Sequence, residues 1–399
     1  MRILIADTLP DTCIEGLQAL GLTVDYRPKL TAEELPDAVP GVCVLIVRST
    51  EVRAPVFARG TSLDLVIRAG AGVNTIDVGA ASARGIYVAN CPGKNSIAVA
   101  ELVFALLLAI DRRIVENVTD LRAGKWHKTE YSRARGLHGR ILGIAGYGGV
   151  GREVAERAHA FGMPVVVWSR SLTAEQARAA EVERVASLLE LCIRCDVISL
   201  HLPLTPETRG IVTDEVLRQL PLGAVLINTA RAELVDTAAL RRAVQERGLR
   251  VGLDVFHEEP AGADGTFADP IVQLPRVYGT HHIGASTEQA QHAIAEEVVN
   301  IVQAFVRTGT VPNCVNLCHR SPGRFQMIVH HLDRVGVLAR VLAALERHGI
   351  NVEEVENTIF DGAVAACCTL RLGARPAPEV LDEIRRAEHV MHVDVSEAG

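Results

Sequence analysis

The chain has 399 residues, of which 48% are hydrophobic and 22% are charged, and its formal net charge is −7. At roughly 100–200 residues per domain, this length predicts two or three domains, and the composition excludes a wholly disordered chain. The acidic balance argues against a general nucleic-acid binder, because such proteins usually present a basic face.

Local patterns predict neither secretion nor membrane insertion. An apolar run follows Arg2 directly, without the charged, apolar and small-residue pattern of a signal peptide. The longest apolar run, 97–110, is interrupted by Glu101 and is shorter than the ~18 residues that a membrane span needs. We therefore expect a cytoplasmic protein with no nucleic-acid or membrane partner. The nine cysteines, including Cys192-x-x-Cys195, are expected to be reduced structural thiols.

Strand-like runs and helix-like stretches alternate from the start of the chain, which predicts α/β domains with parallel sheets. The first runs that predict strands are 3–6, 44–47, 65–67 and 86–88. The apolar stretch 96–114 predicts a helix that is buried on most sides and that Ser96 can cap.

The stretch 99–282 shows the clearest alternation. Its predicted strands are 140–145, 164–168, 196–200, 224–228, 251–255 and 276–279. Their continuous apolar character fits strands that are covered on both faces. A helix-like stretch, 288–307, is expected to return to the first domain. The predicted domains are therefore 1–98 together with 283–318, and 99–282.

The last stretch, 323–399, has a different order of elements. It reads as strand 325–330, helix 337–348, strands 352–360 and 363–371, helix 378–386 and strand 390–395. This βαββαβ order predicts a small ferredoxin-like domain. The expected fold class is thus α/β, with two doubly wound parallel sheets and a C-terminal ferredoxin-like domain.

A glycine-rich turn marks the first candidate binding site. Gly146, Gly148 and Gly151 form a G-x-G-x-x-G pattern between the apolar strand 141–145 and the helix-like stretch 152–161. In this context Gly146 permits a tight turn, Gly148 lets the backbone approach a pyrophosphate, and Gly151 lets helix and strand pack closely. The amides of the helix N-terminus would then bind the phosphates of a dinucleotide.

The residues after the next strand leave the choice of dinucleotide open. NAD is usually recognised by an acidic residue at this point, whereas an arginine can meet the 2′-phosphate of NADP. The strand ends in Ser169 and Arg170, with no carboxylate. We therefore expect NAD or NADP about equally.

Three later segments place polar residues just past predicted strand ends, where open α/β sheets bind ligands. They supply a guanidinium at Arg231, a carboxylate at Glu259 and an imidazole at His282. Hydride transfer from a hydroxy acid needs a base near neutral pKa, a carboxylate beside it and a group that holds the substrate carboxylate. Each of the three residues alone is also compatible with a structural or surface role, but their shared position favours a catalytic one.

With these motifs, the chain resembles the D-isomer-specific 2-hydroxyacid dehydrogenase family over nearly its whole length. Besides the glycine turn and the three later segments, the resemblance rests on Arg68–Val73, Ala80–Gly85, Pro92–Ser96, Gly124–Trp126 and His201–Thr208. The family usually has proline before the catalytic histidine, where this chain has His281. We choose His282 because the motif Ile283–Thr287 follows it in register.

The resemblance implies a role for each matching residue. Arg231 would orient the substrate, Glu259 would be the carboxylate partner and His282 the acid/base. The implied cofactor contacts are Gly146, Gly148, Gly149, Val150, Gly151, Ser169, Arg170, Leu202, Pro203, Thr229, Ala230, Asp254 and His282. The implied substrate contacts are Arg48, Ser49, Arg68, Gly70, Gly72, Asn95 and Arg231. No metal site is expected.

The last domain is similar to an ACT domain, a regulatory module that binds amino acids. Asp333–Leu338 matches its first turn, and Gly349–Val352 follows its first helix. The resemblance implies L-serine as an effector near Asn351 and the Gly336 turn. A plain dimerisation module without a ligand is the open alternative.

Within the family, the chain most resembles members that oxidise D-3-phosphoglycerate to 3-phosphohydroxypyruvate, the entry to serine biosynthesis. The resemblance thus implies a small anionic 2-hydroxyacid substrate and a homodimer or homotetramer. The alternatives are a hydroxypyruvate or glyoxylate reductase, another D-2-hydroxyacid dehydrogenase, and a corepressor-like protein that senses NAD(H) without catalysis.

Overall fold

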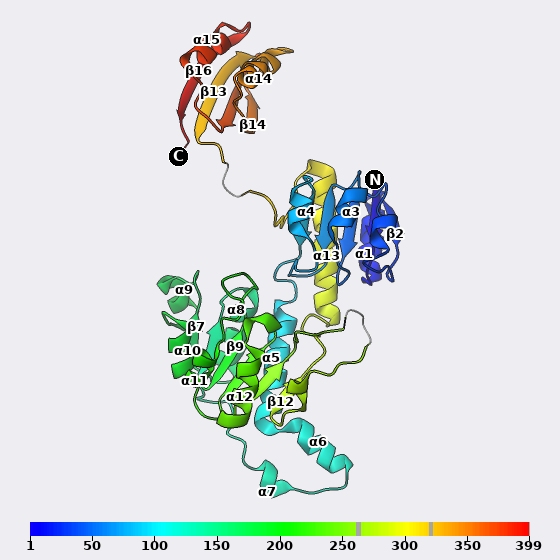
Figure 1. The fold of residues 1–399 in the computed structure, drawn as a ribbon, viewed down its shortest axis with the longest axis vertical. Helices are drawn as coiled ribbons and strands as arrows, with labels where there is room; N and C mark the ends of the chain where they lie inside the picture. Colours follow the sequence, from blue (N-terminus) through cyan, green and yellow to red (C-terminus); the bar gives the residue numbers. More distant parts are fainter. Residues whose placement is uncertain (261–264, 319–321, 399) are drawn as a thin grey trace. The chain divides into compact units, whose positions relative to one another are not determined.

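The computed structural model describes residues 1–260, 265–318 and 322–398. The chain divides into two compact units, Met1–Asn316 and Leu317–Gly399 (Figure 1). The first unit contains a five-stranded and a seven-stranded parallel sheet, and the second contains a four-stranded antiparallel sheet. The expected fold class is confirmed.

The five-stranded sheet has the strand order β2-β1-β3-β4-β5, which reverses between β1 and β3. Its strands are β1 (Arg2–Ile5), β2 (Thr23–Tyr26), β3 (Val44–Val47), β4 (Leu65–Arg68) and β5 (Tyr87–Asn90). The sequence did not predict β2. This strand lies at the sheet edge and has no fully buried side chain, so it lacks the apolar run that marks the others.

Helices cover both faces of this sheet because side chains alternate along its strands. On one face Ile3 and Ile5 of β1 pack against α1 (Asp11–Ala19) and α13 (Glu288–Thr308). On the other face Leu4 packs with residues of α2 (Leu35–Ala38), α3 (Ala54–Arg59) and α4 (Val78–Ser82). Helix α13 therefore returns to the first sheet from late in the sequence, and we call β1–β5 with these helices the first lobe.

The seven-stranded sheet forms the second lobe, with the order β12-β11-β10-β9-β6-β7-β8. Its strands are β6 (Leu142–Ala145), β7 (Val165–Trp168), β8 (Glu183–Arg184), β9 (Val197–Leu200), β10 (Val225–Asn228), β11 (Arg250–Leu253) and β12 (Val277–Gly279). Its helices are α8 (Gly149–Ala160), α9 (Ala174–Ala179), α10 (Leu188–Arg194), α11 (Asp214–Gln219) and α12 (Thr237–Arg247), with 3₁₀ turns at Ala232–Leu234 and Pro270–Gln273. The strand order reverses between β6 and β9, which is where such sheets bind ligands. The two-residue strand β8 was not predicted.

The long apolar helix α5 (Ser96–Arg112) packs into the core of the second lobe through Leu107 and Ile110. The expectation that Ser96 caps it is wrong, because the helix begins at Ser96 and the preceding Asn95 makes no side-chain cap. Arg113 adopts a left-handed conformation, with φ of +50°, and ends α5. Two further helices follow, α6 (Ile114–Arg122) and α7 (Lys128–Tyr131).

The second unit has the predicted ferredoxin-like order. Its strands are β13 (Phe325–Leu332), β14 (Val352–Ile359), β15 (Ala365–Leu372) and β16 (Val390–Glu397), and its helices are α14 (Val337–Arg347) and α15 (Pro378–Arg386). The sheet order is β14-β15-β13-β16, and Met327, Val341 and Leu370 lie in its core.

Two further expectations concern the described residues. None of their helices is both long and apolar enough to cross a membrane. Cys192 and Cys195 are buried free thiols at the end of α10, ahead of β9, so their order is not that of a thioredoxin-like site.

Candidate active site

The glycine turn lies where the order of the seven-stranded sheet reverses. Gly146 follows β6 with a φ of +99°, and a Cβ at this position would lie 2.5 Å from the backbone oxygen of His201, which follows β9. Gly151 lies in the first turn of α8, where a Cβ would overlap the backbone oxygen of Gly146. Both positions therefore require the absence of a side chain.

Gly148 and the first turn of α8 leave room for a ligand. A Cβ on Gly148 would meet no atom within 4 Å. Helix α8 begins at Gly149, three residues earlier than predicted, and no side chain caps it. The N–H groups of Gly149 and Val150 thus remain for an anion, which fits the phosphates of a dinucleotide.

The end of β7 carries the two residues on which cofactor preference depends. The hydroxyl oxygens of Ser169 and Ser171 lie 3.5 Å apart. Arg170 is exposed. A hydrogen bond from Thr205 and, to a smaller extent, the charge of Arg170 hold the pKa of Glu207 below its usual value. Ser169 therefore stands where NAD-specific proteins place a carboxylate, and the positive charge of Arg170 follows it.

The loop after β9 approaches the glycine turn from the other side of the reversal. The Thr208 hydroxyl donates to the backbone oxygen of Pro203 at 2.6 Å, which shapes the loop that also carries the half-buried Leu202. His201 Nε2 lies 2.8 Å from the Ser199 hydroxyl, and burial lowers the pKa of His201 to about 3. His201 is therefore neutral at pH 7.

The turn after β10 is organised by Asn228. Its side-chain amide donates to the backbone oxygen of Arg231 at 2.9 Å and accepts from the N–H of Ala230 at 3.0 Å. The hydroxyl oxygen of Thr229 is buried and has no hydrogen-bond partner among the described residues. Because a buried hydroxyl without a partner is costly, this atom fits contact with a bound ligand.

Asp254, at the end of β11, holds the segment that carries the histidine. Its carboxylate accepts from the Thr280 hydroxyl at 2.6 Å and from the N–H groups of Ile283 and Gly284, each at 2.8 Å. The side chain is therefore occupied in positioning residues 280–284, and its expected contact with the cofactor stays a prediction.

Glu259 and His282 meet as a hydrogen-bonded pair. His282 Nδ1 lies 2.6 Å from Glu259 Oε2, and Glu259 Oε1 accepts from the N–H of Phe256 at 2.9 Å. Burial would raise the pKa of Glu259, but these hydrogen bonds and the charges of His282 and Arg231 outweigh it and leave the pKa below its ordinary value. His282 has a φ of +51°. Among the described residues, its Nε2 has no hydrogen-bond partner.

Arg231 joins the two lobes. Its guanidinium donates to the backbone oxygen of Ala230 at 2.6 Å and to the side-chain oxygen of Asn74, in the first lobe, at 3.3 Å. A Cβ on Gly72 would overlap this guanidinium, so the glycine makes room for it. The sequence did not single out Asn74, because its contact is with a residue 157 positions away along the chain.

Three guanidiniums of the candidate site act on one another. Arg68, at the end of β4, is mostly buried, and its Nε has no partner among the described residues. Burial and the charges of Arg231 and Arg48 lower the pKa of Arg68 to about 10. A Cβ on Gly70 would overlap the Arg68 guanidinium, which explains the glycine. A buried guanidinium with a free N–H is suited to binding an anion.

Asp7 shapes the loop beside these arginines, and sequence reasoning missed it. Its carboxylate follows β1 and accepts from the N–H groups of Arg48, Ser49 and Thr50 at 2.6, 3.1 and 3.0 Å. This contact lies where the order of the five-stranded sheet reverses. Asn95, also expected at the substrate, is half-buried directly before α5.

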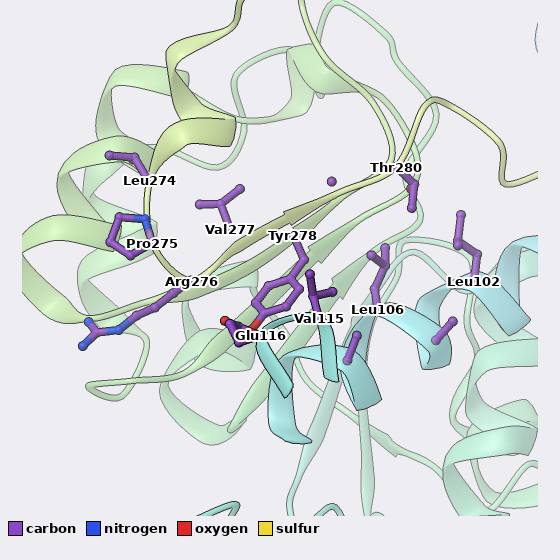
Figure 2. A pocket seen from close by; sticks show the side chains of 13 residues that line it. Leu102, Leu106, Val115, Glu116, Leu274, Pro275, Arg276, Val277, Tyr278 and Thr280 are labelled. Atoms are coloured by element: carbon purple, nitrogen blue, oxygen red, sulfur yellow. The ribbon is translucent and has the colours of Figure 1, made fainter. Parts of the chain in front are cut away.

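A mainly apolar cavity of about 480 Å³ lies beside α5 and α6 and is distinct from this site. Leu102 and Leu106 line it, and the Tyr278 ring points toward Glu116 (Figure 2). The Tyr278 hydroxyl donates to both Glu116 oxygens, at 2.6 and 2.8 Å, which ties α6 to β12. The cavity contains none of the predicted site residues, so we place the chemistry at the histidine and the arginines.

Two solved structures that resemble the chain each match 79% of it. The TT0316 protein from Thermus thermophilus is 37% identical with a TM-score of 0.71, and the match covers 79% of this chain and 100% of that one. The NAD⁺-bound 3-phosphoglycerate dehydrogenase of Entamoeba histolytica is 29% identical with a TM-score of 0.67, and the match covers 79% and 99%.

Sequence comparisons agree with the structural ones. Residues 104–284 match the NAD binding domain of D-isomer specific 2-hydroxyacid dehydrogenases, and residues 326–389 match the ACT domain. D-3-phosphoglycerate dehydrogenase of Methanocaldococcus jannaschii is 39% identical over 319 residues, which are 79% of this chain and 60% of the relative. The chain spans between 58% and 64% of the length of such curated relatives. The chain therefore contains the NAD binding domain of the D-isomer specific 2-hydroxyacid dehydrogenase family and an ACT domain.

Proposed function

We propose that the chain is a nicotinamide-dependent dehydrogenase that oxidises D-3-phosphoglycerate to 3-phosphohydroxypyruvate. The observation that carries the proposal is the 2.6 Å contact between His282 and Glu259. Arg231 lies close enough to Glu259 for its positive charge to help lower the pKa of that carboxylate. The names of the relatives from M. jannaschii and E. histolytica support the choice of substrate.

His282 is the proposed base. With Glu259 holding the Nδ1–H, the neutral ring presents Nε2 as the acceptor for the proton of the substrate hydroxyl. As that proton leaves, C2 loses a hydride with its electron pair and the C2–O bond becomes a carbonyl. A bound nicotinamide ring supplies the acceptor for that hydride. Glu259 stabilises the imidazolium that forms on His282.

Arg231 is the proposed orienting group for the carboxylate and C2 oxygen of the substrate, because its planar fork suits bidentate recognition. The guanidinium of Arg68 supplies a second, mostly buried positive charge. We assign the remaining substrate contacts to Arg48, Ser49, Gly70, Gly72 and Asn95. The cofactor would be held by the glycine turn and by residues that follow strands of the second lobe: Ser169, Arg170, Leu202, Pro203, Thr229, Ala230, Asp254 and His282.

Residues 169 and 170 are expected to set the cofactor preference. A carboxylate at 169 would accept from the ribose hydroxyls of NAD and repel the 2′-phosphate of NADP. Ser169→Asp should therefore raise the ratio of kcat/KM for NAD to that for NADP by about tenfold, and Arg170→Ala should raise it as well. Arg178→Ala, which removes an exposed arginine of α9, is the control. An unchanged ratio in Arg170→Ala would show that Arg170 does not contact the 2′-phosphate of NADP.

The ACT domain is the proposed site of feedback by L-serine. Asn351 follows α14 and donates to Glu353 at 2.8 Å, and Gly336 opens the same helix with a φ of +86°. The resemblance to ACT domains implies that L-serine binds near these two positions.

We also propose a homodimer or homotetramer in a reducing, cytoplasmic compartment. Helix α6 has no buried residue and exposes Ile114, Val115, Val118 and Leu121, which favours burial against another copy of the chain. The buried free thiols Cys192 and Cys195 favour the reducing compartment.

A substrate panel tests the proposal. Reduction of NAD and NADP is followed by absorbance with D-3-phosphoglycerate, D-glycerate and D-lactate, and the reverse reaction with 3-phosphohydroxypyruvate, hydroxypyruvate and glyoxylate. The phosphorylated pair is expected to have the highest kcat/KM, and L-serine to inhibit it. A preference for glyoxylate or hydroxypyruvate would make the chain a reductase of those acids. Cofactor binding without turnover of any acid would make it a binding protein.

A further inference from the structure

The guanidinium of Arg231 is held without being neutralised. Its side-chain partner is the amide oxygen of Asn74, at 3.3 Å, and its other acceptor is the backbone oxygen of Ala230. Both are neutral. Within the described ranges, no carboxylate lies within ion-pair distance of Arg231, Arg68 or Arg48.

The nearby carboxylates are engaged elsewhere. Asp7 accepts from the backbone amides of residues 48–50, and Glu259 accepts from Phe256 and His282. Lys94, at the end of the β5–α5 loop, pairs with Glu297 at 3.0 Å. Three guanidiniums of the candidate site, those of Arg48, Arg68 and Arg231, thus keep their positive charge without a carboxylate partner among the described residues, and Arg68 is mostly buried.

Gly72 and Asn74 form a socket for Arg231, on the loop after β4. The missing side chain of Gly72 makes space for the guanidinium, and Asn74 supplies the acceptor that fixes its direction. Asn74 is exposed, so its replacement does not disturb a packed core. The socket belongs to the first lobe and Arg231 to the second, so the contact positions Arg231 across the two lobes.

We propose that Asn74 is a positioning and specificity-determining residue, which holds Arg231 with a neutral oxygen and so reserves its full charge for a substrate with several negative charges. The inference rests on the proposed function and names a residue that selects phosphorylated over unphosphorylated hydroxy acids. An aspartate at 74 would orient Arg231 equally well but would neutralise it through a charge-assisted hydrogen bond. Its negative charge would also repel a substrate phosphate, which carries about −1.5 to −2 at pH 7.

Two replacements separate orientation from charge. Asn74→Asp keeps an acceptor and adds a negative charge, whereas Asn74→Ala removes the acceptor and stays neutral. Asn74→Asp should raise KM for 3-phosphohydroxypyruvate by about tenfold and KM for hydroxypyruvate by about threefold or less. Asn74→Ala should lower kcat for both acids by about tenfold and leave the ratio of their KM values unchanged.

Asn300→Asp is the matched control, because Asn300 is exposed on α13 in the same lobe. It adds the same charge and should leave both KM values unchanged. Where hydroxypyruvate is reduced too slowly for a KM, its inhibition constant against 3-phosphohydroxypyruvate replaces it. Thermal unfolding and NADH binding are measured for every variant and should match those of the wild type.

The outcomes distinguish this inference from the proposed function. If the wild type does not turn over the phosphorylated acid, the proposed function fails. If it does, but Asn74→Asp changes both KM values by the same factor, Asn74 does not select for charge. Wild-type kcat in Asn74→Ala would show that Asn74 does not position Arg231.

Discussion

His282→Ala is expected to lower kcat by about 10²–10⁴-fold while leaving NADH binding intact. Glu259 contacts Nδ1 of the ring, so Nε2 is the nitrogen of the pair that can accept the proton of the substrate hydroxyl and return it. The His282 side chain is 51% exposed, so alanine opens no buried cavity and the fold should be unchanged. Steady-state turnover and NADH fluorescence titration measure the two effects separately.

His281→Ala is the control for this assignment. His281 is also exposed, but Glu259 pairs with His282. His281→Ala should therefore retain most of the activity. Glu259→Gln should lower kcat less than His282→Ala, because glutamine still accepts from Nδ1 but does not stabilise the imidazolium. Full activity in His282→Ala, or its loss only in His281→Ala, would overturn the assignment.

The choice between His281 and His282 shows which part of the site can be predicted from the sequence alone. The motif register favours His282, and in the fold this histidine contacts Glu259. Asp254 binds the N–H groups of Ile283 and Gly284, and this turns the preceding residue, with its positive φ, toward Glu259. Such an arrangement depends on residues 29 and 30 positions apart along the chain, and no local pattern in the sequence encodes it.

Regular elements were more predictable than contacts between the lobes. The buried strands are visible in the sequence as apolar runs, whereas the edge strands β2 and β8 have exposed side chains and leave no such signal. Asp7 and Asn74 are single polar residues in loops. Their importance arises when the chain folds and brings Asp7 to the loop after β3 and Asn74 to Arg231.

Gly151→Ala is expected to destabilise the chain and weaken dinucleotide binding. A Cβ at this position overlaps the backbone oxygen of Gly146, which cannot move without disturbing the turn after β6. Alanine in a helix gains about 0.5–1 kcal/mol over glycine. Overpacking against a rigid backbone costs about 1–3 kcal/mol or more, so the clash decides the sign. Thermal unfolding and NADH titration would show a lower Tm and weaker binding.

Gly148→Ala separates the two effects, because a Cβ there meets no atom of the chain within 4 Å and the φ of −83° suits alanine. This variant should unfold within about 0.5 kcal/mol of the wild type but bind NADH more weakly, since its methyl group occupies the space assigned to the pyrophosphate. Equal NADH affinity in Gly148→Ala would place the dinucleotide elsewhere. Wild-type stability in Gly151→Ala would show that the turn after β6 can move to accept the methyl group. Position 151 would then not need glycine for close packing of the helix against the strand.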